Sequence, residues 1–128
     1  MQQPHSQRPG VTEGPGPLSR LERTVLTAML KGEGGEFATL RAQLARATVM
    51  SRTHSGVGFV TRITGPDDVA ALGDADSPRL RPVLAAHPQL AERAEFLLQL
   101  RGGRLAVLEA YCYAGGWPAD EAEFRVVV

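Results

Sequence analysis

Residues 95–113 read Glu-Phe-Leu-Leu-Gln-Leu-Arg-Gly-Gly-Arg-Leu-Ala-Val-Leu-Glu-Ala-Tyr-Cys-Tyr, with an apolar run on either side of Gly102 and Gly103. Two consecutive glycines can both take a positive φ at little steric cost, which the tightest hairpin turns require. This stretch therefore predicts an antiparallel β-hairpin with strands at residues 96–101 and 104–113.

The second strand of this hairpin alternates, so its side chains divide between the two faces of a sheet. One face would carry Leu105, Val107, Glu109, Tyr111 and Tyr113, and the other Ala106, Leu108, Ala110 and Cys112. Glu109 is then a single carboxylate among large apolar and aromatic neighbours. Of all positions in the chain, Glu109 most resembles a functional site.

Two interpretations of Glu109 are open. In a pocket, burial would raise the pKa of its carboxyl group and suit it to general acid or base catalysis. At the surface, it would instead pair with Arg101 or Arg104 across the hairpin. The surface interpretation is favoured, because no second acid or base stands at a spacing that would complete a catalytic mechanism.

Two helix patterns precede this region. Ser19 and Glu22 match a capping box, in which each residue satisfies a free amide of the other at the start of a helix. Apolar residues at helical spacing follow, and they predict a helix at residues 20–31. After a glycine break the same spacing predicts a second helix at residues 36–47.

A second hairpin pattern follows the helices. β-Branched and alternating residues predict strands at residues 48–54 and 57–64, with a turn at Ser55-Gly56. Three apolar side chains of the second strand are expected to face inward: Val57, Phe59 and Ile63.

Two segments lack a regular pattern. Residues 1–17 are rich in proline and glycine and contain too few apolar residues to offset the entropy of ordering, so they predict a flexible tail. Residues 65–93 contain four prolines. We expect only short helical turns there, at residues 67–72 and at residues 83–86 or 88–93.

These elements predict a single α+β domain over residues 18–128. A last strand at residues 124–128 is expected to close the sheet. The predicted fold is an N-terminal helical pair packed on an antiparallel sheet of about four or five strands.

Composition excludes several classes of protein. The chain has 128 residues, of which 43% are hydrophobic and 22% charged, as is ordinary for a globular domain. The net charge of zero combines +4 over residues 1–64 with −4 over residues 65–128. A neutral total argues against nucleic-acid binding, which requires a concentrated basic face.

The sequence indicates neither a membrane nor an oxidising compartment. Its first residues lack the apolar stretch of a signal peptide, and no run approaches the ~20 apolar residues of a membrane span. Cys112 is the only cysteine, which excludes an internal disulfide. Arginine greatly outnumbers lysine, as GC-rich bacterial genomes produce. We therefore expect a cytoplasmic bacterial protein.

No motif indicates a metal or a cofactor. A catalytic Cys112 would need a basic neighbour such as His54, whereas a lone cysteine is more often a small buried hydrophobic residue. The three histidines and Cys112 show none of the spacings of zinc sites. Gly56 and Gly58 precede a strand pattern rather than a helix, unlike a dinucleotide-binding loop. We interpret Gly58 as a glycine of close packing or of a bulge.

Aromatic and acidic side chains gather at the end of the main hairpin and just after it. Tyrosine and tryptophan are enriched at binding hot spots, although they also form the edges of cores. We interpret this group as a surface for another protein, with an acidic rim. The candidate residues are Glu109, Tyr111, Tyr113, Trp117, Asp120 and Glu121.

Three short motifs occur in a fixed order: Gly-Val-Gly-Phe at residues 56–59, Gly-Arg-Leu-Ala-Val-Leu-Glu-Ala-Tyr-Cys-Tyr at residues 103–113, and Trp117-Pro118. In this order the chain resembles a group of small uncharacterised bacterial α+β proteins with a GVGF strand and a G-x-L-x-x-L-E-x-Y-x-Y strand before a Trp-Pro. The resemblance covers about residues 18–128 and implies a fold rather than an activity. The chain departs from the group at Ala110, where a glycine is usual, and at Cys112, where a hydroxyl residue is usual.

The function predicted from the sequence is a protein-interaction module, with an immunity protein that neutralises a toxin or an accessory regulator as its concrete form. The expected partner is another protein, and a homodimer is a further option; nucleic acid and membrane are not expected. The alternative is a domain that binds or hydrolyses a small molecule through Glu109 and the neighbouring tyrosines, with Arg62 or Arg52. A concave pocket at Glu109 would favour this alternative, and an exposed face would favour the interaction module.

Overall fold

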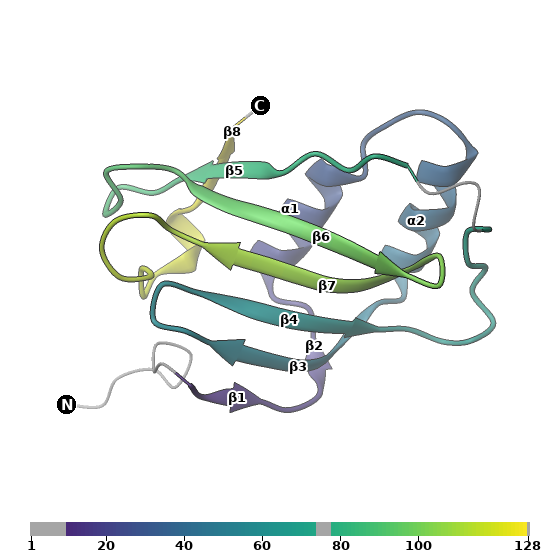
Figure 1. The fold of residues 1–128 in the computed structure, drawn as a ribbon, viewed down its shortest axis with the longest axis horizontal. Coiled ribbons are helices and arrows are strands. Elements are labelled where there is room, and N and C mark those ends of the chain that lie inside the picture. Colours follow the sequence, from purple (N-terminus) through teal and green to yellow (C-terminus); the bar gives the residue numbers. More distant parts are fainter. Residues whose placement is uncertain (1–9, 74–77, 128) are drawn as a thin grey trace.

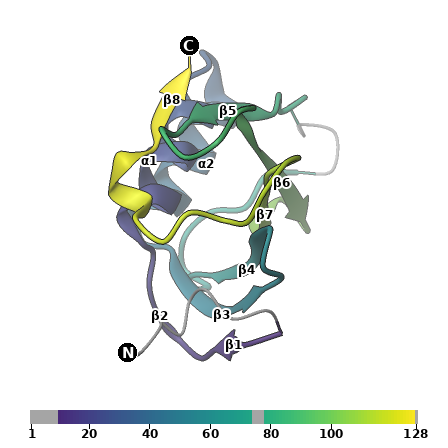
Figure 2. The ribbon, with the colours of Figure 1, turned by 90° about the vertical axis from the view of Figure 1, so that its left-hand side faces the viewer.

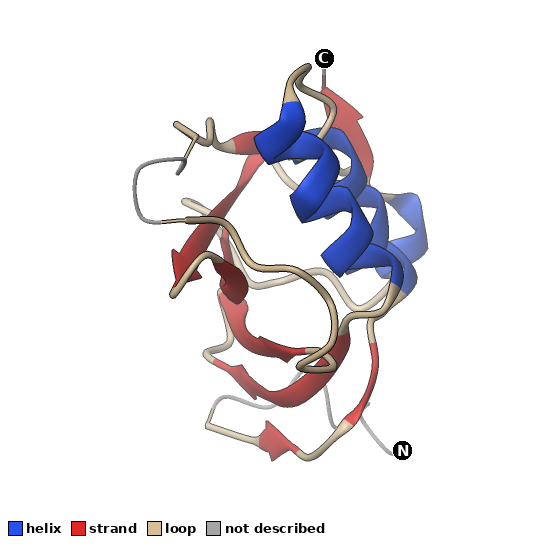
Figure 3. Cartoon of the chain, turned by 90° about the vertical axis from the view of Figure 1, so that its right-hand side faces the viewer, coloured by secondary structure: helices blue, strands red, loops and turns tan. Residues whose placement is uncertain are grey.

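The fold consists of one antiparallel sheet with two helices on one of its faces (Figures 1 and 3). It is seen in a computed structural model, which describes residues 10–73 and 78–127. Along the chain the elements are β1 (Thr12–Glu13), β2 (Gly16–Pro17), α1 (Arg20–Met29), α2 (Gly35–Ala45), β3 (Thr48–His54), β4 (Gly58–Thr64), β5 (Val83–Ala86), β6 (Ala94–Arg101), β7 (Arg104–Tyr111), the 3₁₀ helix η3 (Glu121–Glu123) and β8 (Arg125–Val127). Within these residues the sheet has 8 strands in the order β1-β3-β4-β7-β6-β5-β8, and β2 also pairs with β3. The sheet curves around the helices, as Figure 2 shows.

The predicted fold class is wrong in the size of the sheet and in the place of the helices. The sheet has 8 strands rather than four or five. The helices are not the first elements, because β1 and β2 precede α1. The additional strands are short, and β1 and β2 have 2 residues each. A strand of two residues cannot show an alternating pattern, so hydrophobic periodicity does not reveal it.

The hairpin at the two glycines is confirmed. β6 pairs with β7 from Arg101 opposite Arg104 to Glu95 opposite Tyr111. Gly102 and Gly103 have φ angles of 56° and 73°, the positive values that this turn requires. The second strand ends at Tyr111 rather than at residue 113.

The hairpin of β3 and β4 is also confirmed, with one exception. The amide of Ser55 donates to the carbonyl oxygen of Gly58 (3.1 Å) across the predicted turn. Phe59 and Ile63 are buried as expected. Val57 is 44% exposed, because it lies in the turn before β4 begins.

Residues 12–13 and 16–17 are strands of the sheet, so the prediction of a flexible tail is wrong for them. Thr12 lies opposite Thr53, and Gly16 lies opposite Val49. The amide of His54 donates to the carbonyl oxygen of Val11 (2.9 Å). Backbone pairing with β3 holds this segment, and such pairing needs little apolar side-chain content. Residues 1–9 lie outside the described part of the chain.

The connection from β4 to β6 contains a strand instead of the predicted helical turns. Within residues 67–72 the structure has only a turn and bend at residues 67–69, and within residues 88–93 it has a turn at residues 88–89 and a bend at residues 91–92. Residues 83–86 are β5, which pairs with β6 on one side and β8 on the other. A four-residue apolar run is too short for its periodicity to separate a strand from a helix. The last predicted strand is confirmed for Arg125–Val127, while Val128 lies outside the described residues.

Both predicted helices are present. α1 begins at the predicted capping box, since the Glu22 amide donates to Ser19 Oγ (3.0 Å) and the Ser19 amide donates to Glu22 Oε1 (2.7 Å). The guanidinium of Arg41 in α2 donates to the carbonyl oxygens of Leu30 and Gly32, both at 2.8 Å, just after α1 ends. These bonds satisfy acceptors that a helix end leaves free and join the two helices.

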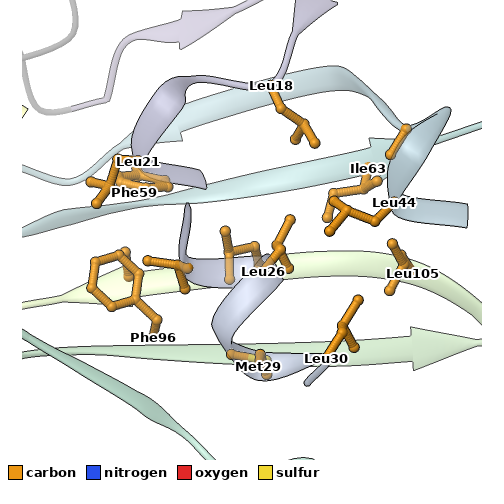
Figure 4. Close-up of a cluster of buried hydrophobic side chains, with 14 of the residues drawn as sticks. Leu18, Leu21, Leu26, Met29, Leu30, Leu44, Phe59, Ile63, Phe96 and Leu105 are labelled. Carbon is orange, nitrogen blue, oxygen red and sulfur yellow. The ribbon is translucent and has the colours of Figure 1, made fainter. Parts of the chain in front are cut away.

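The core lies between the helices and the inner face of the sheet (Figure 4). α1 and the loops that flank it contribute several leucines, and Leu44 of α2 joins them. From the sheet, Phe59, Ile63, Phe96 and Leu105 point toward these helices.

A bulge in β7 changes which residues share a face. Gln99 lies opposite Val107, whereas Leu100 lies opposite Leu105, so Ala106 has no partner of its own. The extra residue turns Leu105 to the inner face with Leu108, and both are buried. The predicted alternation therefore holds from Val107 to Tyr111 and fails at Leu105.

Candidate interaction surface

The face of the sheet that points away from the helices is open (Figures 1 and 3). Glu109 lies on this outer face in the centre of the sheet, opposite Val60 of β4 and Leu97 of β6. Its side chain is exposed, whereas Val60 and Leu97 are only partly exposed. We define the outer face by the residues that the register places together there: Val60, Arg62, Glu95, Leu97, Gln99, Val107, Glu109 and Tyr111.

The structure places Glu109 at the surface but, among the described residues, without the arginine partner expected there. It lines none of the four hollows described below. No described residue forms an ion pair with it either. Arg104 instead donates to the carbonyl oxygen of Asp67 (3.2 Å), beside the hairpin turn. Glu109 is thus an exposed charge without a partner in the described part of the chain.

Glu95 joins the two candidate tyrosines at one end of the outer face. Tyr111 donates its hydroxyl to Glu95 Oε2 (2.6 Å), and Tyr113 donates to Glu95 Oε1 (2.9 Å). The tyrosine rings lie edge to face, with centroids 5.3 Å apart. The hydrogen bond to Glu95 raises the pKa of Tyr111, so its hydroxyl remains a donor. Sequence reasoning missed Glu95, although the hairpin register that places it opposite Tyr111 was predictable.

Trp117, Glu121 and Asp120 lie apart from the outer face. Trp117 is 6% exposed and packs edge to face on Phe59, with ring centroids 5.5 Å apart. Its Nε1 donates to Glu121 Oε2 (2.8 Å). Asp120 accepts a hydrogen bond from the Ala122 amide at the start of η3 (3.1 Å). The structure therefore divides the six candidates into an outer group of three and a group of three around η3.

A buried charged network joins α1 to the sheet, and sequence reasoning missed most of it. Strand register places Arg52 of β3 between Glu13 of β1 and Thr61 of β4 on the inner side. Glu22 of α1 is fully buried above them and accepts hydrogen bonds from Arg52 Nε (2.8 Å) and from the Thr61 hydroxyl. Burial acts to raise the pKa of Glu22, but the bonds from Arg52, Thr61 and Ser19 outweigh burial and lower it. Glu22 therefore remains ionised when buried.

Glu13 extends this network to the edge of the sheet. One of its oxygens accepts from Arg52 Nη1 (3.0 Å), and the other accepts from His54 Nε2. His54 is 3% exposed, and its Nδ1 has no hydrogen-bond partner in the described residues. Burial would lower the pKa of Arg52, but its bonds with Glu22 and its proximity to Glu13 raise it. The two carboxylates thus hold one buried cation.

This network holds α1 against the sheet. Its central residues Arg52, His54 and Thr61 line none of the four hollows described below. Cys112 is buried as predicted, and its Sγ donates to the carbonyl oxygen of Gly115 (3.6 Å). Burial raises the pKa of this thiol and disfavours the reactive thiolate. The described residues contain no group of three or more ligands that could hold a metal ion.

Four hollows of the described surface lie away from Glu109. One of about 240 Å³ lies beside the hairpin turn, between Gln43, Asp67 and Arg104. Three others, of about 310 to 380 Å³, lie along α1. None of these four is the pocket at Glu109 that would favour a small-molecule or hydrolytic domain.

Comparison with known proteins found no protein-family model, no curated protein and no solved structure that matches the chain. Among the described residues, no helix has the length and apolar character needed to cross a membrane.

Glu121→Gln should change the pH dependence of stability. Burial raises the pKa of Glu121, although the bond from Trp117 partly opposes this. A carboxyl group with a raised pKa stabilises the fold fully below its unfolded pKa of about 4.3, and that contribution is lost as the pH rises through the folded value. Glutamine cannot ionise, so the variant should gain stability relative to the wild type between pH 4 and pH 7. Urea unfolding of both proteins at pH 4 and pH 7 measures this gain. The same difference in free energy of unfolding between variant and wild type at the two pH values would contradict the prediction.

Proposed function

We propose that this chain is a protein-interaction module of the bacterial cytoplasm that binds a partner protein through the outer face of its sheet. The observation that carries the proposal is Glu109, an exposed charge with no partner in the described residues, set between the apolar side chains of Val60 and Leu97. The class of function is that of an immunity protein or an accessory regulator, which act by binding another protein.

The composition of the outer face supports this proposal. An antiparallel sheet with one solvated face normally carries polar residues there. Here Val60, Leu97 and Val107 point away from the core, and the tyrosines bound to Glu95 stand at one end. Exposed apolar groups that adjoin charged groups are typical of interaction sites. Glu109 would then set specificity by meeting a basic group of the partner.

Site-specific photo-crosslinking in the organism of origin tests this proposal. A photoreactive amino acid at position 109 or 113 should form adducts with one and the same protein. The control position is Ala45, which is exposed at the end of α2 on the opposite side of the molecule. Absence of adducts from both test positions, or equal adducts from position 45, would contradict the proposal. Adducts with a second copy of this chain would assign a homodimer instead of a separate partner.

Glu109→Arg should weaken binding of the captured partner by about tenfold or more, because two like charges would then meet at the interface. Glu33→Arg is the matched control, since Glu33 is exposed between the helices and the change in charge is the same. Isothermal titration calorimetry measures both affinities. Equal effects of the two substitutions would show that net charge, and not the outer face, determines binding.

A further inference from the structure

Three adjacent hollows lie along α1 beside β8 and share lining residues. The largest has a volume of about 380 Å³ and lies between Arg20, Arg23, Lys31 and Val126. It shares Arg20 and Val126 with a second hollow of about 310 Å³. It shares Lys31 and Val126 with a third of about 360 Å³. We call these three adjacent hollows together the basic groove.

The groove has a floor of small side chains and a basic rim. One stripe of α1 supplies Thr24, Thr27 and Ala28, and β8 supplies Val126. The short side chains of this floor leave room for the main chain of a ligand to lie close to the protein. The rim residues are Arg20, Arg23, Lys31, Arg79 and Arg81, all exposed.

The charges of the rim are not used within the described fold. None of these five cations forms an ion pair with a described residue. The one carboxylate that lines the groove is Glu121, which already accepts the hydrogen bond of Trp117. Arg20 and Arg23 stand at the N-terminal end of α1, where a cation opposes the helix dipole. The stability of α1 therefore does not explain these arginines.

The groove also borders a free strand edge. β8 ends the strand order and pairs only with β5 among the described residues, so its other edge has unpaired amide and carbonyl groups. Figure 2 shows β8 at the end of the sheet with α1 beside it. An edge of this kind can accept one further strand.

We propose that the basic groove binds an extended acidic segment of a partner protein, which adds to β8 as a further strand. The length of α1 is about 14 Å at a rise of 1.5 Å per residue. About four residues of extended chain cover this length. Alternate carboxylates of such a strand would face α1 and meet the basic rim, and the side chains between them would point to the opposite face of the sheet. This site is separate from the outer face and does not depend on the function proposed for that face.

A designed peptide tests the proposal with the full chain. The probe is a fluorescein-labelled peptide, Glu-Val-Glu-Thr-Glu-Val-Glu, and its partner probe has lysine in place of each glutamate. Fluorescence anisotropy at low salt should show saturable binding of the acidic probe and none of the basic probe. N-methylation of alternate amides in the acidic probe should weaken binding about tenfold or more, because it removes the donors of strand pairing. No binding of the acidic probe, or equal binding of the methylated probe, would overturn the proposal.

Two charge-reversal variants locate the site. Arg20→Glu with Arg23→Glu should weaken binding of the acidic probe about tenfold or more, and it should leave the chain folded, because acidic residues are favourable near a helix N-terminus. Arg93→Glu with Arg101→Glu is the matched control, with the same change in net charge at exposed positions outside the groove. Circular dichroism verifies folding. Equal loss in the two variants would overturn the assignment to the groove.

Two further measurements separate other occupants. A dT oligonucleotide of equal charge should not compete with the acidic probe, and competition at similar concentrations would assign a general polyanion site instead. Sedimentation should show that the Arg20→Glu, Arg23→Glu variant has the same oligomeric state as the wild type. A wild-type dimer that this variant dissociates would assign the groove to a second copy of the chain and overturn the proposal.

Discussion

Replacing Glu22 by alanine should lower the free energy of unfolding by about 3–5 kcal/mol. The substitution removes a fully buried carboxylate that accepts hydrogen bonds from Arg52 and Thr61. The side chain of Arg52 is only 14% exposed, and it would retain Glu13 as its one charged partner. The capping box with Ser19 would be lost as well. Urea unfolding at pH 7, followed by circular dichroism, measures the effect.

Two comparison variants separate loss of charge from loss of packing. Glu33→Ala removes an exposed glutamate and should change stability by less than about 0.5 kcal/mol. Glu22→Leu combined with Arg52→Met removes both charges and should be more stable than Glu22→Ala, because no unpaired charge stays buried. A loss below about 1 kcal/mol in Glu22→Ala would contradict the role given to the network.

The contribution of Glu22 also has a defined pH dependence. Hydrogen bonds from Arg52, Thr61 and Ser19 lower its pKa against the effect of burial. A carboxyl group with a lowered pKa stabilises the fold above its unfolded pKa of about 4.3, and the contribution is lost as the pH falls through the folded value. Acid should therefore destabilise the wild type more steeply than Glu22→Gln. Glu121 has the opposite sign, because its pKa is raised.

Local features of the sequence predicted the elements that depend on local chemistry. The two adjacent glycines at residues 102–103 specify a turn, and the turn sets the register of the two strands around it. Ser19 and Glu22 specify the start of α1, because capping requires only residues three apart. These signals do not depend on the rest of the fold, so they hold whatever surrounds them.

The elements that failed depend on partners distant in sequence. Residues 12–13 and 16–17 are strands only because β3 offers an open edge to them. Residues 83–86 become a strand because β6 and β8 lie on either side. The bulge at Ala106 adds one residue to β7, and alternation cannot indicate where it occurs. Pairing between distant segments is a tertiary property, and propensity alone does not contain it.

The same distinction applies to the candidate sites. Glu109 and Tyr111 were placed correctly on one strand face, because alternation near the end of β7 is regular. Arg52 joins Glu22 only through the meeting of α1 with β3, 30 residues apart in the sequence. The basic groove likewise needs α1 beside β8, near the other end of the chain. No spacing within the sequence could have predicted these two features.

Gly58→Ala should destabilise the chain by about 3 kcal/mol or more, since relief of the overlap requires movement of backbone and not of a side chain. Gly58 lies opposite Tyr111, and a Cβ there would overlap the carbonyl oxygen of Ala110 and lie 2.8 Å from the Cα of Tyr111. Its φ is not in the positive range, so the close approach of β7 explains the glycine. This agrees with its interpretation from the sequence as a glycine of close packing.

Matched glycines test this explanation of Gly58. Gly116→Ala should change stability by less than about 0.5 kcal/mol, because a Cβ there meets only the carbonyl oxygen of Gly56 at an ordinary 3.7 Å. Gly102→Ala should cost about 1–2 kcal/mol, because its φ of 56° is unfavourable for alanine although the space is open. Thermal and urea unfolding of the three variants measure the order of these effects. A loss in Gly58→Ala no larger than that in Gly102→Ala would show that β4 and β7 can move apart at little cost. A larger loss in Gly58→Ala than in Gly102→Ala would instead show that β4 and β7 are held rigidly together where Gly58 lies opposite Tyr111. Such rigidity would fix the position of Tyr111 at that end of the outer face.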